Sequence, residues 1–193
     1  MKHKLRLTVI LLASALGLVF AFTVAAQHGL EPGQPKKVAI KADNGGWWGR
    51  CNQCQKSVND AYPDTIMIGE KTDTAKVPGQ HFDMHKLKDG KVAFKADTGN
   101  WVGMCTDCIV NGAKKDFITV HVKGDNPDDL PSWAKFQVEK LGFDKVALKA
   151  DNGKYVARCN SCSPGAAYPE QVTAHMEDTS EPSAQWELVD IED

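Results

Sequence analysis

Short stretches of alternating apolar and polar residues begin near residue 37, and turn-forming residues bound each of them. The first stretch covers residues 38–42, in which Val38 and Ile40 lie on one face. A period of two is typical of a half-buried strand. Residues 43–46, with the sequence DNGG, form a tight-turn signal because Asn and Gly tolerate positive φ. Residues 47–51 are predicted to be the returning strand, so this part of the chain is expected to be a β-hairpin.

The same hairpin recurs three times at a fixed spacing. The stretch VAIKADNGGWWGRCNQC at residues 38–54 returns as VAFKADTGNWVGMCTDC at 92–108 and as VALKADNGKYVARCNSC at 146–162. The offset between successive copies is 54 residues both times. Self-similarity at a fixed period indicates a repeat architecture.

Two further strands are predicted in each repeat. A short strand at residues 65–68 matches 119–122 and 173–176 at the same offset. The fourth strand carries apolar residues at positions 1, 3 and 6 in each of its copies, which are residues 82–87, 136–141 and 186–191. The final step of three departs from strict alternation and indicates a bulge or bend. Each repeat therefore has four predicted strands and no helix.

Three four-stranded units close most economically as a β-trefoil, a six-stranded barrel capped by three hairpins. Propellers typically use four to eight blades, whereas this chain has room for three repeats only. We therefore predict an all-β fold of twelve strands with pseudo-threefold symmetry. Equivalent apolar residues are expected to form layers around the axis: Ile40, Phe94 and Leu148 in one layer, and Phe82, Phe136 and Trp186 in another, with Met84, Val138 and Leu188 beside it.

The first 26 residues have the composition of a secretory signal peptide. Lys2, Lys4 and Arg6 precede a nearly continuous apolar run over residues 7–21, and residues 24–26 offer a cleavage site. Because the run is short for a membrane span, we expect a secreted or periplasmic protein without membrane contact after cleavage. The expected organisation is a signal peptide at 1–26, a flexible leader at 27–36 and a β-trefoil at 37–193, with repeats at about 37–90, 91–144 and 145–193.

Charge and motifs narrow the range of functions. Removing the signal peptide removes three of the 23 basic residues and none of the 25 acidic ones, which leaves a net charge near −5 (20 minus 25). Such a chain lacks the basic footprint of a nucleic-acid-binding protein. No Ser-His-Asp order, phosphate loop or H-E-x-x-H motif is present. We therefore expect a protein that is not an enzyme and uses no cofactor or metal.

All six cysteines occur as C-x-x-C pairs, one in each repeat: Cys51 and Cys54, Cys105 and Cys108, and Cys159 and Cys162. Export to an oxidising compartment favours structural disulfides, and pairing within each motif is the simplest arrangement. Two alternatives stay open. Converging pairs could bind zinc, and a C-x-x-C motif at a helix N-terminus could carry out thioredoxin-like redox chemistry.

Each hairpin turn brings a polar pair next to an aromatic residue, and this combination has two interpretations. The candidates are Asp43, Asn44, Trp47 and Trp48 in the first repeat, Asp97 and Trp101 in the second, and Asp151, Asn152 and Tyr155 in the third. In the first interpretation, the polar residues simply form the turn while the ring packs beneath its own hairpin. Alternatively, carboxylate and amide groups bind sugar hydroxyls while the ring stacks on the sugar. Three weak sites on one body would gain avidity on a polymer.

Two further features lie outside the turns. Trp133 follows a Pro-containing loop at residues 126–132, where a large aromatic residue either contacts a ligand or packs against the barrel. His121 and His175 occupy equivalent positions at the 54-residue offset, with Met67 in the first repeat. We expect both histidines to be strand-surface residues.

The stretch VALKADNGKY at residues 146–155, preceded by FQVEKL, resembles the repeat of β-trefoil proteins of the fascin-like and actin-cross-linking group. The resemblance covers about residues 37–191, and it implies a trefoil fold and a protein-binding or scaffold role. Ricin B-type trefoil lectins carry a Q-x-W signature in the repeat. At the matching positions, residues 80–82, 134–136 and 184–186, only part of one copy fits it. From the turn residues we expect a secreted carbohydrate-binding module, with an extracellular protein as the alternative partner.

Overall fold

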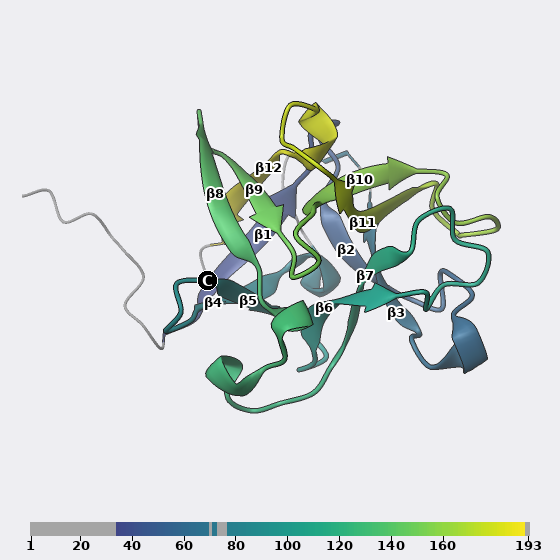
Figure 1. Ribbon diagram of the computed structural model, residues 1–193, viewed down its shortest axis with the longest axis horizontal. Coiled ribbons are helices and arrows are strands. Elements are labelled where there is room, and N and C mark those ends of the chain that lie inside the picture. Colours follow the sequence, from purple (N-terminus) through teal and green to yellow (C-terminus); the bar gives the residue numbers. More distant parts are fainter. Residues whose placement is uncertain (1–33, 70, 73–76, 192–193) are drawn as a thin grey trace, which may run out of the picture.

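The computed structural model describes residues 34–69, 71–72 and 77–191, and these residues form an all-β protein (Figure 1). The predicted signal peptide lies outside the described residues. The strands are β1 (Lys36–Lys41), β2 (Trp48–Asn52), β3 (Asp64–Ile68), β4 (Phe82–Lys86), β5 (Val92–Lys95), β6 (Trp101–Thr106), β7 (Asp116–Val122), β8 (Gln137–Gly142), β9 (Lys145–Lys149), β10 (Tyr155–Asn160), β11 (Glu170–Met176) and β12 (Trp186–Asp190). Short 3₁₀ turns connect them: η1 (Val58–Asp60), η2 (Pro78–Gln80), η3 (Pro127–Asp129), η4 (Ser132–Ala134) and η5 (Pro182–Ala184). The described part of the chain contains no helix long and apolar enough to cross a membrane.

Six strands close into a barrel, on the left in Figure 1: β1, β4, β5, β8, β9 and β12. The closure follows threefold symmetry, because the same pairing occurs in each repeat. Val38 lies opposite Phe82 and Val146 opposite Trp186. Val92 and Phe136 exchange two backbone hydrogen bonds of 2.9 and 2.8 Å, which join β5 to β8. The predicted β-trefoil of twelve strands is confirmed.

The three remaining hairpins, β2–β3, β6–β7 and β10–β11, cap the other end. Their second strands pair cyclically around the axis, with Thr65 opposite Thr119, Phe117 opposite Thr173, and Gln171 opposite Met67. Thr65, Phe117 and Gln171 are therefore equivalent.

The match of residues 65–68 to 119–122 and 173–176 was wrong by two positions. Asn52 pairs with Asp64, 12 positions away, whereas Thr106 pairs with Asp116 and Asn160 with Glu170, 10 positions away. The first repeat thus has a loop that is two residues longer. A pattern based on a constant offset could not detect this insertion.

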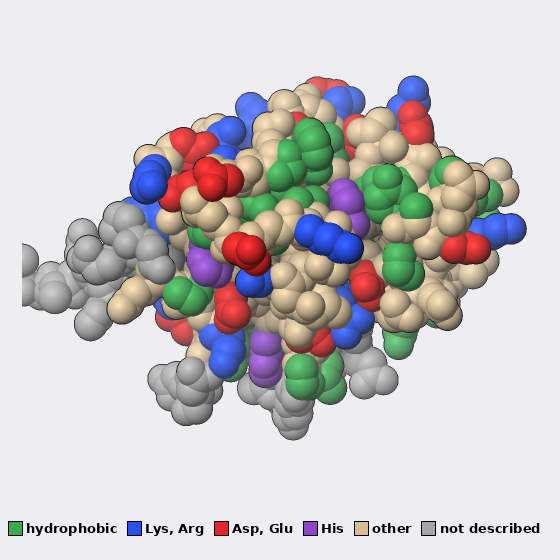
Figure 2. All heavy atoms as spheres, turned by 90° about the horizontal axis from the view of Figure 1, so that it is seen from below, with side chains coloured by type: hydrophobic (Ala, Val, Ile, Leu, Met, Phe, Trp, Pro, Cys, Tyr) green, Lys and Arg blue, Asp and Glu red, His purple; other side chains and the backbone are tan. Residues whose placement is uncertain are grey.

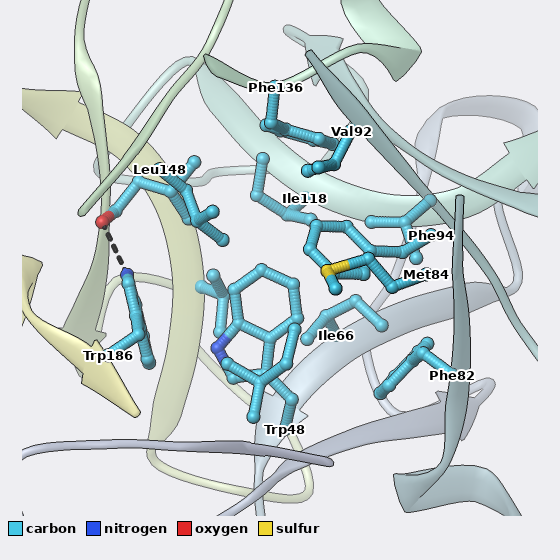
Figure 3. Close-up of a cluster of buried hydrophobic side chains, with 14 of the residues drawn as sticks. Trp48, Ile66, Phe82, Met84, Val92, Phe94, Ile118, Phe136, Leu148 and Trp186 are labelled. Carbon is cyan, nitrogen blue, oxygen red and sulfur yellow. Dashed lines mark hydrogen bonds between the residues drawn. The ribbon is translucent and has the colours of Figure 1, made fainter. Parts of the chain in front are cut away.

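The predicted apolar layers form one core (Figure 3). Ile40, Phe94 and Leu148 are fully buried, as are Phe82, Phe136 and Trp186. Met84 is buried beside them, and Val138 and Leu188 are partly buried against the same cluster. The layer assignment is therefore confirmed, and each large side chain removed from water contributes roughly 1.5–3 kcal/mol to folding.

Candidate functional site

The three hairpin turns share one backbone geometry. Ala42, Ala96 and Ala150 each donate a backbone hydrogen bond to the residue four positions later, at 2.8, 2.9 and 2.9 Å. The glycine inside each turn has a positive φ, between +79° and +85°. Three copies of one sequence pattern thus place three aspartates, Asp43, Asp97 and Asp151, at equivalent positions around the molecule.

The aromatic residues beside these turns do not offer stacking surfaces. Trp47 and Trp101 are 2% and 0% exposed, and their indole N–H groups donate to the backbone oxygens of Thr72 and Gly124 at 2.8 and 2.7 Å. A buried ring has no free face for a sugar, so the stacking interpretation is wrong for both. These two tryptophans are buried in the fold, in agreement with the structural interpretation.

Trp48 does not offer a stacking surface for a sugar either, because its side chain is fully buried at the centre of the core. Its ring lies 5.2 to 6.3 Å from the rings of Phe82, Phe94 and Trp186 (Figure 3). Val102 and Val156 occupy the equivalent positions on β6 and β10, opposite smaller neighbours. One large and two small side chains therefore occupy positions that are related by threefold symmetry.

Tyr155 is half-buried and is held by its own neighbours. Its hydroxyl donates to Glu139 Oε2 at 2.8 Å, and Lys149 Nζ lies 5.1 Å from the ring centre. The hydrogen bond to the Glu139 carboxylate raises the pKa of the Tyr155 hydroxyl. The tyrosine therefore supports its hairpin.

Two of the three turn aspartates form ion pairs with arginines from a neighbouring repeat. Arg158 on β10 forms a bidentate pair with Asp43, with both N···O distances at 2.8 Å, and also donates to Glu170. Arg50 on β2 holds Asp97 in the same way, at 2.5 and 2.9 Å, and donates to Asp64. Each guanidinium lowers the pKa of its turn aspartate and has its own pKa raised.

The third position lacks its arginine. Met104 on β6 lies opposite Ile118, as Arg50 lies opposite Ile66 and Arg158 opposite Val172. Asp151 instead accepts a 2.9 Å hydrogen bond from the hydroxyl of Ser132. Of the three turn carboxylates, that of Asp151 alone is left without a cationic partner within the described part of the chain, because β6 carries a thioether there.

A cleft of about 650 Å³ opens where the arginine is replaced, and we call it the Met104 cleft. Its lining includes Tyr62, Met104, Thr106, His121, Trp133 and Asp151. The cleft lies between three repeats, since Tyr62 comes from the first, Met104 and Trp133 from the second, and Asp151 from the third. Figure 2 views the side of the η3–η4 loop, where hydrophobic side chains gather beside a histidine near the middle of the face.

Trp133 is the exposed aromatic residue of this cleft, at 45% exposure. It belongs to η4 and lies three residues before Phe136. The equivalent positions, three residues before Phe82 and Trp186, hold Gly79 and Ser183. Both departures from symmetry, Met104 and Trp133, therefore meet in one cleft. The sequence carried this information, because a comparison of the three repeats position by position shows both substitutions.

His121 forms one wall of the Met104 cleft. Its Nδ1 lies 2.6 Å from the hydroxyl of Thr119, and the edge of its ring packs against Tyr62 at 5.1 Å between ring centres. Burial lowers the pKa of His121. Burial therefore favours the neutral form of this ring, which lies half-buried on β7.

The related cleft of the first repeat is smaller, at about 400 Å³, and differs in chemistry. It is lined by Arg50 in place of Met104 and by Tyr168 in place of Tyr62, and Asp97 does not reach it. The described residues that line it include no tryptophan, because Gly79 stands where the second repeat has Trp133. Of the predicted polar residues, Asp151 lines the Met104 cleft. Hydrogen bonds to other repeats or strands hold the remaining four, Asp43, Asn44, Asp97 and Asn152.

The cysteine pairs lie in the loops of the cap. Within each motif the Cα atoms are 5.6, 5.8 and 5.7 Å apart, which matches a disulfide closed within the motif. The loops also bond cyclically, because the backbone oxygens of Cys54, Cys108 and Cys162 each accept a hydrogen bond from the preceding repeat around the axis, from Ala167, Val58 and Ala113. In the described residues no three His, Cys, Asp or Glu side chains are grouped to hold a metal. The geometry thus favours the structural interpretation of these pairs.

Solved structures of similar fold agree with this architecture. ThreeFoil, a designed threefold-symmetric protein, has a TM-score of 0.56 at 13% identity, over 80% of this chain and 99% of that one. The ricin B-like lectin of Macrolepiota procera, solved with lactose, has a TM-score of 0.51 at 9% identity, over 84% and 99%. The Haemophilus ducreyi cytolethal distending toxin has a TM-score of 0.54 at 16% identity, over 84% and 88%.

The fold is a β-trefoil. At these identities the likeness extends to the fold alone. The chain matches no protein-family model and no curated protein.

Proposed function

We propose that the protein is an exported, non-enzymatic carbohydrate-binding module whose sugar site is the Met104 cleft. The observation that carries the proposal is the exposed ring of Trp133 in the same cleft as the Asp151 carboxylate, at the one threefold position where no arginine occupies that carboxylate.

The chemistry of the cleft suits a sugar ring. An aromatic face packs against the C–H face of a pyranose, while a carboxylate accepts hydrogen bonds from neighbouring hydroxyls. Trp133 supplies the ring, Asp151 the acceptor, and the hydroxyl of Thr106 a further polar group. The volume of about 650 Å³ falls within the usual range for small-ligand sites. The ligand therefore enters as one or two sugar units, with the rest of a glycan outside.

A binding role is favoured over hydrolysis by the number of carboxylates. Glycosidases commonly use two carboxyl groups flanking the scissile bond. Asp151 is the single acidic residue among the described residues that line the Met104 cleft. The lectin that shares the fold was solved with lactose, which supports a saccharide as the ligand class.

The proposal is tested with a glycan array probed by the mature protein and two variants. Trp133→Ala and Asp151→Asn should each reduce binding to the recognised glycans about tenfold or more, without a change in melting temperature. Phe143→Ala and Asp144→Asn are matched controls, because they remove an exposed ring and a carboxylate from the β8–β9 turn, outside the cleft. Binding that survives both cleft variants would place the sugar elsewhere, and an array without signal would reject the function.

A protein-binding scaffold role of the fascin-like kind is the second candidate. Phe143 at the β8–β9 turn is fully exposed, and its neighbour Leu141 is 36% exposed, so an apolar tip projects from the barrel. Phe143 also holds φ at +48°, a conformation that side chains other than Gly rarely adopt. If the array gives no signal and a partner recovered by the mature protein is lost with Phe143→Ser, this second function is correct.

A further inference from the structure

A second cleft, which we call the lysine cleft, adjoins the proposed sugar site. It has a volume of about 410 Å³, and its lining includes Lys91, Lys135 and Lys149. Asp151 lines both clefts, so the two share a boundary. The η4 loop contributes to both, with Trp133 in the Met104 cleft and Ser132 and Lys135 in the lysine cleft.

Within the described part of the chain, none of the three lysines forms an ion pair that would neutralise its charge. Lys135 Nζ donates to the backbone oxygen of Asp128 at 2.6 Å, and Lys149 Nζ lies over the ring of Tyr155 at 5.1 Å. The carboxylate of Asp128 is engaged by Lys88, through the backbone N–H at 3.0 Å and Nζ at 3.3 Å. Among the described residues that line the lysine cleft, Asp151 is the single acidic one.

The lysine cleft is positively charged, whereas the protein as a whole carries a small net negative charge. The chain carries 23 basic and 25 acidic residues, yet the lysine cleft brings three lysines and one aspartate together. Lys135 is also a departure from the repeat, because His81 and Gln185 stand at the same place before Phe82 and Trp186. The second repeat therefore differs from the others in the basic cleft as well as in the Met104 cleft.

We propose that the saccharide is anionic and that its charged group, a uronic carboxylate or a sulfate ester, binds in the lysine cleft while a sugar ring stacks on Trp133. This inference rests on the proposed carbohydrate function and specifies the class of sugar. Asp151 lies between the two clefts. There its carboxylate accepts a hydrogen bond from a hydroxyl of the saccharide, and its negative charge repels the anionic group toward the lysines. A lysine ammonium group is a compact point charge and attracts carboxylates and sulfates alike. The lysine cleft therefore specifies that the ligand is negatively charged, without specifying which anionic group carries the charge.

The test measures binding of three tetrasaccharides by calorimetry: a galacturonic acid tetramer, a heparin-derived sulfated tetramer and a neutral galactose tetramer. At low salt at least one acidic tetramer should bind about tenfold more tightly than the neutral one. The difference should shrink at 0.3 M NaCl, because salt screens partly exposed charges. Whichever acidic tetramer binds identifies the source of the anion.

The variant Lys91→Gln/Lys135→Gln/Lys149→Gln should lose the preference for the acidic tetramer and keep the neutral affinity. Lys86→Gln/Lys115→Gln/Lys140→Gln is the matched control, because these exposed lysines lie outside both clefts. If the triple variant is misfolded by circular dichroism, the single variant Lys91→Gln is measured instead and should lose part of the preference.

Two outcomes would overturn the inference, and they are distinguishable. Equal affinity for acidic and neutral tetramers, or a preference that survives the lysine substitutions, would reject the anionic ligand and leave the sugar function in place. Absence of binding to all saccharides would reject the proposed function, and the inference with it.

Discussion

Three equivalent positions in this trefoil differ in what occupies the aspartate of the hairpin turn. At two of them, Arg50 holds Asp97 and Arg158 holds Asp43, each through a bidentate pair that joins two repeats. At the third, Met104 replaces the arginine and Asp151 lines a cleft of about 650 Å³. Where the strand carries arginine, the turn aspartate is held in an ion pair between two repeats. Where it carries methionine, the aspartate lines an open cleft.

A scaffold with threefold symmetry can thus carry a single candidate binding site. The backbone of the turn is the same in all three copies, so the scaffold places each carboxylate equally well. An arginine fork saturates a carboxylate through two parallel hydrogen bonds, whereas methionine offers no donor. Trp133 and Lys135 then add an aromatic face and a charge where the other repeats have small or neutral residues.

The largest effect is expected from Met104→Arg, which makes the third position like the other two. The new guanidinium should pair with Asp151 and with Asp116, as Arg50 does with Asp97 and Asp64. We expect glycan binding to weaken about 100-fold, roughly 2.7 kcal/mol, in a calorimetric titration. Unfolding should occur at the same or a higher temperature, so a lower melting temperature together with unchanged binding would refute the comparison.

The reverse change, Arg50→Met, should destabilise the fold. It removes the guanidinium that donates to the carboxylates of Asp97 and Asp64, which are 25% and 13% exposed, and leaves Asp64 with the weaker amide donor of Asn52 at 3.1 Å. Removing charge-assisted hydrogen bonds of this kind costs on the order of 1–3 kcal/mol. Urea denaturation should report this loss, and Arg158→Met should act similarly. A neutral result for both would mean that the clamps contribute nothing to stability.

A smaller effect is expected from pH. The pKa values of Asp43 and Asp97 are lowered by hydrogen bonds to Arg158 and Arg50. Their contribution to stability is present above the unfolded pKa of about 3.9 and is lost as pH falls through the lower folded pKa. The urea midpoint of the parent should therefore drop below pH 4, and Asp43→Asn/Asp97→Asn should flatten that part of the profile.

The repeat spacing was enough to predict the fold. Three hairpins at a constant offset placed the barrel strands correctly, because Ile40, Phe94 and Leu148 obey the same pattern and meet in the core. The register of the third strand was wrong because the first repeat carries two more residues between Asn52 and Asp64. Loop length leaves no trace in a strand pattern, so pairing was needed to detect it.

The site was predictable in part. Asp151 was among the candidates, but the tryptophans beside the turns were buried in the fold, which alternation alone does not distinguish from exposure. The clamps join residues 47 and 115 positions apart, for Arg50 with Asp97 and Arg158 with Asp43. Contacts at this separation cannot be read from a local pattern, although the exception at Met104 is visible once the repeats are compared.

The most direct test of the account is the number of saccharide molecules bound per chain, measured by calorimetric titration with the strongest ligand from the array. We expect one molecule per chain for the parent, and for Met104→Arg the same site with an affinity about 100-fold lower. A stoichiometry of three, or a single site that Met104→Arg leaves intact, would contradict it.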